Sequence, residues 1–104
     1  MIFPMTNYII SAKAKDDLRK IWSYTLEKWS EKQAETYYGN LVNAFDYIAF
    51  NPFSAGHPYN EVSDGLRGMT VNKHIVFYRI LKNDKVRIIR ILHSRMDIKR
   101  HKME

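Results

Sequence analysis

The sequence carries KHIVFYRIL at residues 73–81, KNDK at 82–85 and VRIIRIL at 86–92, two apolar runs around a polar turn. β-Branched and aromatic residues of this kind fit strands best. Two such runs separated by a short polar segment predict a β-hairpin. The basic, histidine-bearing LHSRMD at 92–97 is of interest because strand ends and the loops after them often hold functional residues.

The two faces of this predicted hairpin follow from the alternation of side chains along a strand. If the turn closes symmetrically, residue 81 lies opposite residue 86 and residue 74 lies opposite residue 93. One face then holds His74, Val76, Tyr78, Ile80, Arg87, Ile89, Ile91 and His93, and the other holds Ile75, Phe77, Arg79, Leu81, Val86, Ile88, Arg90 and Leu92. Arg79 and Arg90 interrupt the more apolar second face, so the sequence leaves open which face is covered.

Two amphipathic helices are predicted before the hairpin. Ser11 is the expected N-cap of the first, and Ser30 to Gln33 has the capping-box pattern that starts the second. Asn51-Pro52 ends the second helix, because the residue before proline is driven out of helical geometry. A join of one or two residues predicts an antiparallel helical hairpin. The apolar stripes are Leu18, Ile21, Trp22, Thr25 and Trp29, then Ala34, Tyr37, Tyr38, Leu41, Val42, Phe45, Ile48 and Ala49.

The remaining segments complete a two-layer arrangement. Residues 7–11 predict a short first strand, residues 53–65 a loop, and residues 66–71 a strand before the hairpin. The order β-α-α-β-β-β indicates an α+β fold with the N-terminal helical hairpin packed on a mainly antiparallel sheet. At 104 residues the chain, 1–104, is a single domain. We expect residues 1–5 to be a frayed N-terminus and residues 98–104 to be a solvated, basic C-terminal tail.

Charge is unevenly distributed along the chain. Residues 1–66 hold 6 basic and 8 acidic side chains, whereas residues 67–104 hold 11 basic and 3 acidic ones, a net +8. This asymmetry predicts an acidic or polyanionic partner for the C-terminal part. The alternative is a surface whose lysines and arginines only keep the protein in solution.

Composition narrows the class of function. The chain has no cysteine, which excludes disulfides and thiolate metal sites. It has neither the ~20-residue apolar run of a membrane span nor a secretion signal, so we expect a cytoplasmic location and no membrane partner. His57, His74, His93 and His101 lack metal-ligand spacing, and there is no Gly-rich phosphate loop. We therefore predict no metal and no cofactor.

The candidate functional side chains are arginines and one histidine. Guanidinium binds phosphate or carboxylate with two bonds in a fixed plane, which makes Arg67, Arg79, Arg90 and Arg95 candidates for contact with an anionic target. Pairing with carboxylates of the same chain is the alternative. His93 can serve as a general acid or base, as a polar contact, or as a half-buried residue that holds the strand end to the next turn.

Short motifs along nearly the whole chain resemble the ParE branch of the RelE/ParE toxin superfamily. They are Ser11 with Ala14 and Asp17-Leu18, Gln33-Ala34 with Tyr37, Asn51-Pro52, Gly65-Leu66-Arg67, His74 to Tyr78, and Ile91-Leu92-His93 with Arg95-Met96-Asp97. The resemblance implies a single RelE/ParE-like toxin domain of a type II toxin–antitoxin pair.

Two functional classes exist within this resemblance. ParE-like toxins bind DNA gyrase and block replication, which implies target-binding roles for Arg67, Arg79, Arg90, His93 and Arg95 and no catalytic residue. RelE-like toxins are ribosome-dependent mRNA endoribonucleases, which implies catalytic roles for His93, Arg67, Arg95 and Arg79. Ile75 stands where those RNases commonly carry an arginine, and no tyrosine follows Tyr78, so the gyrase-directed class is favoured.

The resemblance also implies a partner. A ParD-like antitoxin, acidic and with an amphipathic helix, is expected to form a toxin–antitoxin hetero-oligomer and to contact Trp22, Trp29, Tyr37 and Tyr38 on the helical stripes. Core packing is the alternative role for these four aromatic residues. A basic binding domain without toxicity is a third possibility for the whole chain.

Overall fold

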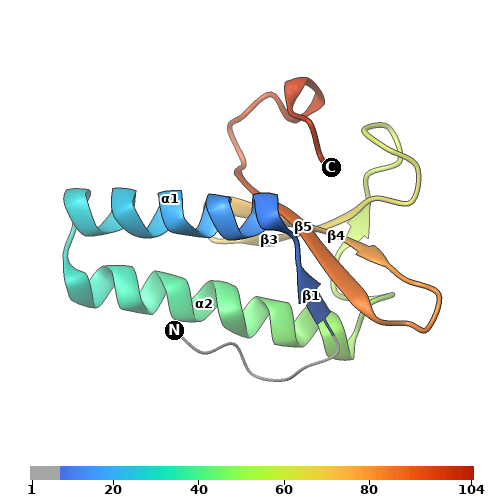
Figure 1. Ribbon diagram of the computed structural model, residues 1–104, viewed down its shortest axis with the longest axis horizontal. Helices are drawn as coiled ribbons and strands as arrows, with labels where there is room; N and C mark the ends of the chain where they lie inside the picture. Colours follow the sequence, from blue (N-terminus) through green and yellow to red (C-terminus); the bar gives the residue numbers. More distant parts are fainter. Residues whose placement is uncertain (1–7) are drawn as a thin grey trace.

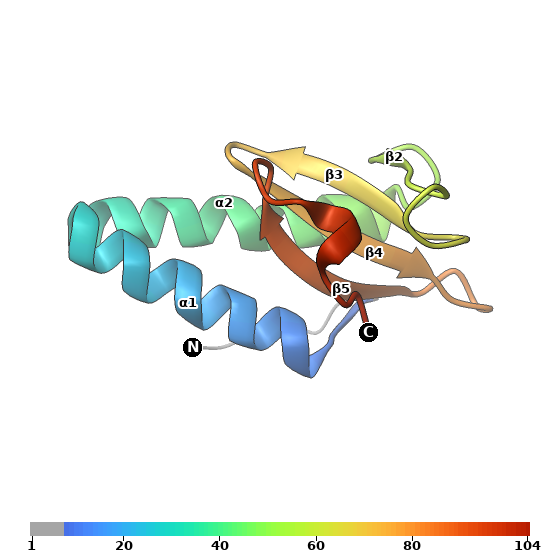
Figure 2. The same cartoon turned by 90° about the horizontal axis from the view of Figure 1, so that it is seen from above.

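Two helices and a five-stranded sheet form two layers in a computed structural model that describes residues 8–104. The elements are β1 (Tyr8–Ile10), α1 (Ala12–Lys28), α2 (Glu31–Phe50), β2 (His57–Pro58), β3 (Arg67–Val71), β4 (His74–Ile80), β5 (Val86–His93) and a 3-10 helix (Ile98–Arg100). Both helices lie on one face of the sheet (Figure 1, Figure 2). The predicted α+β fold is confirmed. The segment expected to be frayed, residues 1–5, lies outside the described residues.

The helices begin and end where the sequence predicts. Ser11 Oγ accepts a hydrogen bond from Ala14 N, and Ser30 Oγ accepts one from Gln33 N, each at 3.1 Å. Asn51 caps the end of α2, and its N–H donates to main-chain oxygens of the last turn. Within residues 8–104, neither helix combines the length and the apolar composition that crossing a bilayer requires.

The sheet has the strand order β1-β5-β4-β3-β2. β1 pairs parallel with β5, and all other neighbours are antiparallel, so the first strand lies beside the last. The predicted loop at residues 53–65 is wrong at one point, because His57 and Pro58 form β2 on the outer side of β3. Proline is tolerated there because an edge strand leaves one row of N–H positions without a neighbour.

The pairing of β4 with β5 differs in part from the symmetric register. His74 lies opposite His93 as predicted, but Ile80, not Leu81, lies opposite Val86. The turn closes one residue early, since Leu81 N donates to Lys85 O at 2.7 Å. A β-bulge opposite Phe77 and Tyr78 then absorbs the extra residue of β5. The face assignments are therefore wrong for the first half of β5.

This bulge gives the sheet two packed faces. Val86 and Ile88 join Ile91 on the face under the helices, with Val76, Tyr78, Leu41, Phe45 and Ile48. Ile89 packs on the opposite face in a second cluster with Leu66, Ile75, Phe77, Leu92 and Met103. Residues 97–104, drawn in red, cover that second face (Figure 2). The expectation of a fully solvated tail is wrong, because Met103 is only 7% exposed.

Candidate functional site

Arg67 holds the loop that follows α2. Its Nε donates to Tyr78 Oη at 3.1 Å, and its Nη2 donates to Phe53 O at 3.1 Å and Gly56 O at 2.8 Å. Tyr78 Oη in turn donates to Pro52 O at 2.9 Å. Its guanidinium, predicted to contact a target, is therefore bonded within the chain.

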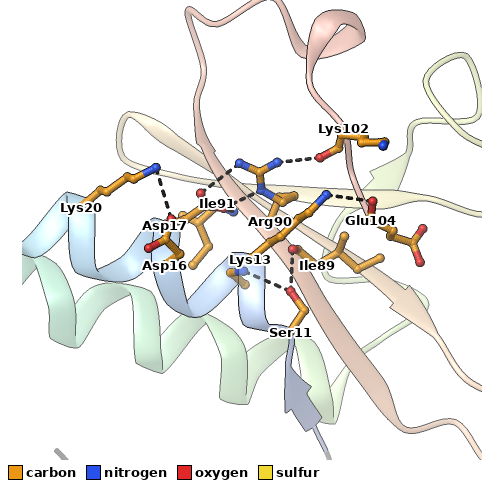
Figure 3. A network of polar contacts seen from close by, with 11 residues as sticks. Ser11, Lys13, Asp16, Asp17, Lys20, Ile89, Arg90, Ile91, Lys102 and Glu104 are labelled. Atoms are coloured by element: carbon orange, nitrogen blue, oxygen red, sulfur yellow. Dashed lines mark hydrogen bonds and ion pairs between the residues drawn. The ribbon is translucent and has the colours of Figure 1, made fainter.

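Arg90 lies between α1 and the C-terminal segment (Figure 3). Its Nε and Nη2 donate to the two carboxylate oxygens of Asp17 at 2.8 Å and 3.0 Å, and Asp17 also accepts Ile91 N at 2.9 Å. Asp17 is 7% exposed, so the ion pair is buried and satisfies both partners. The bond to Asp17 raises the pKa of Arg90 against the opposing effect of burial. The contact ties α1 to β5.

Arg79 forms its bonds on the sheet face opposite the helices. Its Nε pairs with Glu104 Oε1 at 2.7 Å, while Nη1 donates to Asp64 O and Nη2 to Ser63 Oγ, both at 2.7 Å. Three of the four predicted arginines thus have partners in the chain. Their partners lie far away in the sequence, which is why sequence reasoning could not assign them.

Arg95 differs from the other three arginines. Its side chain is exposed, and within residues 8–104 no hydrogen bond or ion pair to its guanidinium is formed. Its main-chain N donates to His93 Nδ1 at 3.1 Å, which orients the imidazole at the end of β5. Arg95 and His93 therefore form the part of the predicted target-binding set that can reach a partner.

Three rings cluster at the open end of the β4–β5 hairpin, away from its turn. His74 and His93 lie edge to face with ring centroids 5.3 Å apart, and Tyr37 Oη shares a hydrogen bond with His74 Nδ1. Burial and the neighbouring His93 lower the pKa of His74 from 6.5 to about 4, against the opposing effect of Asp17. His74 is therefore a neutral imidazole near pH 7. Sequence reasoning placed the two histidines opposite each other but did not link Tyr37 to them.

The four helical aromatic residues have different surroundings. Trp22 and Tyr38 pack edge to face across the helical hairpin, with centroids 6.0 Å apart, and both are half-buried. Tyr37 faces His74, while Trp29 caps α1 and is 61% exposed. Tyr24 and Leu26 of α1 are also exposed, although the predicted stripe missed them. The sequence signal for these two residues is an apolar side chain on the otherwise polar face of the first amphipathic helix.

The sequence of residues 8–98 matches the family described as the ParE toxin of type II toxin-antitoxin system, parDE. The chain belongs to this ParE toxin family. Toxin ParE1 of Caulobacter vibrioides is 36% identical over 97 residues, covering 93% of this chain and 98% of the relative. Toxin ParE1 of Mycobacterium tuberculosis is 34% identical over 96 residues, covering 92% and 97%.

A solved structure agrees with the fold of this ParE-family chain. A chain of the structure described as the chromosomal ParDE TA system from P. aeruginosa superposes with a TM-score of 0.72 at 20% identity. The match covers 86% of this chain and 96% of that chain. At this identity it supports the fold alone.

Family membership supports an antitoxin as the partner of this chain, because the family is the toxin of a type II toxin-antitoxin system. Exposed aromatic side chains lie on the helical hairpin, where Tyr24 is 60% and Trp29 61% exposed. Among residues 8–104, no group of three histidine, cysteine or acidic side chains is placed to hold a metal ion.

Proposed function

We propose that this ParE-family chain inhibits DNA gyrase, with His93 and Arg95 in the contact surface, and that it acts in the cytoplasm. The observation that carries the proposal is the family match over residues 8–98. The guanidinium of Arg95 lies in the basic C-terminal part and has no partner among residues 8–104, which supports a role in binding an acidic surface of the target.

The positions of the arginines argue against the endoribonuclease alternative. Arg67 pairs with Tyr78 in the sheet, four residues along β4 from His74, which lies opposite His93. Four residues of strand span about 13 Å. Arg67 and His93 therefore do not converge on one phosphate, as a catalytic set must. The cluster of Tyr37, His74 and His93 is the one feature that favours RNA cleavage.

The deciding experiment compares two targets. Purified gyrase is assayed for supercoiling and DNA cleavage with and without the protein, beside an assay of ribosome-dependent mRNA cleavage. Trapped, cleaved DNA with intact mRNA supports the proposal. Cleaved mRNA with unaffected gyrase contradicts it and moves attention to His93.

Arg95→Ala tests the contact surface within the same assay. We expect it to weaken gyrase inhibition about tenfold or more without loss of the fold, because truncating a hot-spot arginine in an interface typically costs about 2 kcal/mol or more. Arg100→Ala is the matched control, since that side chain is 86% exposed and pairs with Asp97. Equal inhibition by both variants contradicts a role for Arg95.

The finer identity of the antitoxin is a second part of the proposal. A ParD-like antitoxin with an amphipathic helix fits the exposed aromatic side chains of the helical hairpin, Trp29 above all. Trp29→Ala is expected to weaken antitoxin binding by at least tenfold. Tyr47→Ala is the control, because Tyr47 is similarly exposed but lies near the other end of α2. If the Trp29 variant binds the antitoxin with unchanged affinity, the turn between α1 and α2 is not part of the interface.

A further inference from the structure

In the turn that follows β5, three consecutive main-chain N–H groups are bonded. Ser94 N donates to Lys73 O at 2.8 Å, and Met96 N donates to His93 O at 3.0 Å. Between them, Arg95 N donates to His93 Nδ1 at 3.1 Å, and this acceptor is the side chain among the three. The conformation of the chain at Arg95 therefore depends on the imidazole of His93.

The bond from Arg95 determines the state of the His93 ring. Nδ1 accepts a hydrogen bond only when it carries no proton, so the proton of the neutral ring lies on Nε2. The acceptor and the donor are two residues apart, as in an Asx turn, where an Asn or Asp side chain accepts from the N–H two residues on. The imidazole of His93 thus occupies the role that an asparagine amide oxygen has in an Asx turn.

His74 and Tyr37 fix the ring of His93 from two other elements. His74 of β4 lies opposite His93 and meets its ring edge to face, with centroids 5.3 Å apart. Tyr37 of α2 bonds to His74 Nδ1 and packs edge to face on that ring, with centroids 5.5 Å apart. All three rings are half-buried, so a partner reaches only part of each. His74 is neutral near pH 7 and places no positive charge against His93.

The side chain of Arg95 has the opposite environment. It is exposed, and no bond to its guanidinium is formed within residues 8–104, so only the main chain of the turn sets its direction. A long side chain loses conformational freedom when it binds, and ordering the main chain beforehand lowers this cost. The ring of His93 supplies that order.

We propose that His93 is a positioning residue for Arg95: its Nδ1 fixes the turn from which Arg95 contacts the target, and Tyr37 with His74 fixes the ring. The proposal rests on the proposed function only in taking Arg95 as a target contact. It assigns different roles to the two residues of the contact surface, because Arg95 binds the target and His93 acts through Arg95.

Two substitutions of His93 separate positioning from direct contact. His93→Leu removes the acceptor, whereas His93→Asn removes the ring but keeps an acceptor for the Arg95 N–H. In the free full-length chain, NMR should show the Arg95 N–H exchanging with solvent about fivefold faster in His93→Leu, the factor that corresponds to the usual net contribution of one hydrogen bond. His93→Asn should restore most of the protection. In the wild-type chain, the ¹⁵N chemical shift of His93 Nδ1 should be that of an unprotonated ring nitrogen.

Gyrase inhibition tests the consequence of this geometry. His93→Leu should weaken inhibition about fivefold, because the lost hydrogen bond no longer orders the turn before binding. His93→Asn should inhibit more strongly than His93→Leu, which is the rescue that an acceptor alone provides. His57→Leu is the control, because His57 is exposed on β2, and it should inhibit as the wild type does.

Tyr37→Phe guards against loss of the fold in the His93 variants. It keeps all three rings and removes only the hydroxyl that bonds to His74. Exchange of the Arg95 N–H should be faster than in the wild type, and circular dichroism reports whether each variant is folded. A wild-type exchange rate in the Tyr37→Phe chain overturns the role of Tyr37 and His74.

Two results would overturn the role of His93. One is equal protection of the Arg95 N–H in the wild-type and His93→Leu chains. The other is an equal loss of gyrase inhibition in His93→Asn and His93→Leu, since His93 would then contact the target itself. A wild-type chain that leaves gyrase unaffected contradicts the proposed function instead, and the exchange rates of the free chains still decide whether His93 positions Arg95.

Discussion

Asp17 is the buried charge on which the packing of α1 against β5 depends. Replacing it with alanine leaves the guanidinium of Arg90 and the N–H of Ile91 without their acceptor. We expect Asp17→Ala to lower the free energy of unfolding by about 3–5 kcal/mol, as when one partner of a buried ion pair is removed. Urea denaturation measures this. Asp16→Ala is the control and should change little, because that carboxylate pairs with Arg19 and Lys20 at the surface.

The lowered pKa of His74 leads us to predict a loss of folding stability in acid. Its pKa is about 4 in the folded chain and 6.5 as the reference for the unfolded one. The unfolded state therefore takes up a proton first as the pH falls from 6.5 to 4, and stability decreases across that window. The half-buried ring is partly screened by solvent, so we expect a loss of about 1–2 kcal/mol.

The measurement for His74 is a difference between two chains. Unfolding free energies of the wild-type and His74→Asn proteins are compared from pH 7 to pH 4, which cancels the carboxylates that both share. The His74→Asn chain should show the shallower decrease. Parallel curves for the two proteins would contradict the assignment.

The two helix caps are similar as local elements but differ in their tertiary contacts. Ser30 accepts one bond at the start of α2, whereas Ser11 caps α1 and its hydroxyl also donates to Ile89 O at 2.8 Å. We expect Ser30→Ala to cost about 1 kcal/mol and Ser11→Ala about 2 kcal/mol. Chemical denaturation of the two variants gives the comparison. Equal costs would show that the bond to Ile89 contributes nothing.

Local sequence patterns predicted the helices and strands well. Features that depend on contacts between distant segments could not be predicted from them. The serine caps, the stop at Asn51 and the opposition of His74 to His93 all follow from residues near one another in the sequence. The early closure of the β4–β5 turn and its compensating bulge do not, because they serve packing on two faces at once.

The same limit applies to the site. Arg90 and its carboxylate partner are 73 positions apart, and Arg79 is bound by a glutamate 25 positions away. Nothing in the local sequence distinguishes these arginines from Arg95, which has no such partner within residues 8–104. The sequence therefore singles out the four arginines, but it does not show that Arg95 alone among them lacks a side-chain partner within residues 8–104.

At the scale of the whole molecule, β5 joins the parts of the fold. It pairs with both β1 and β4, supplies Val86, Ile88 and Ile91 to the core under the helices, and holds Asp17 through Arg90. We expect a chain that stops after Lys85 to be unfolded by circular dichroism and proton NMR. A chain that stops after Met96 keeps β5 and is the control, and it should retain dispersed spectra. A folded 1–85 fragment would contradict this view of β5.

The pairing of the first strand with the last has a consequence for synthesis. A ribosome adds about 5–20 residues per second, so the 104-residue chain takes about 5–20 s to make. During most of that time β1 and the helical hairpin have no sheet to cover, because their neighbour β5 is translated among the last residues. Such distant pairing also slows folding itself. The growing polypeptide therefore cannot complete the toxin fold until β5 has been translated.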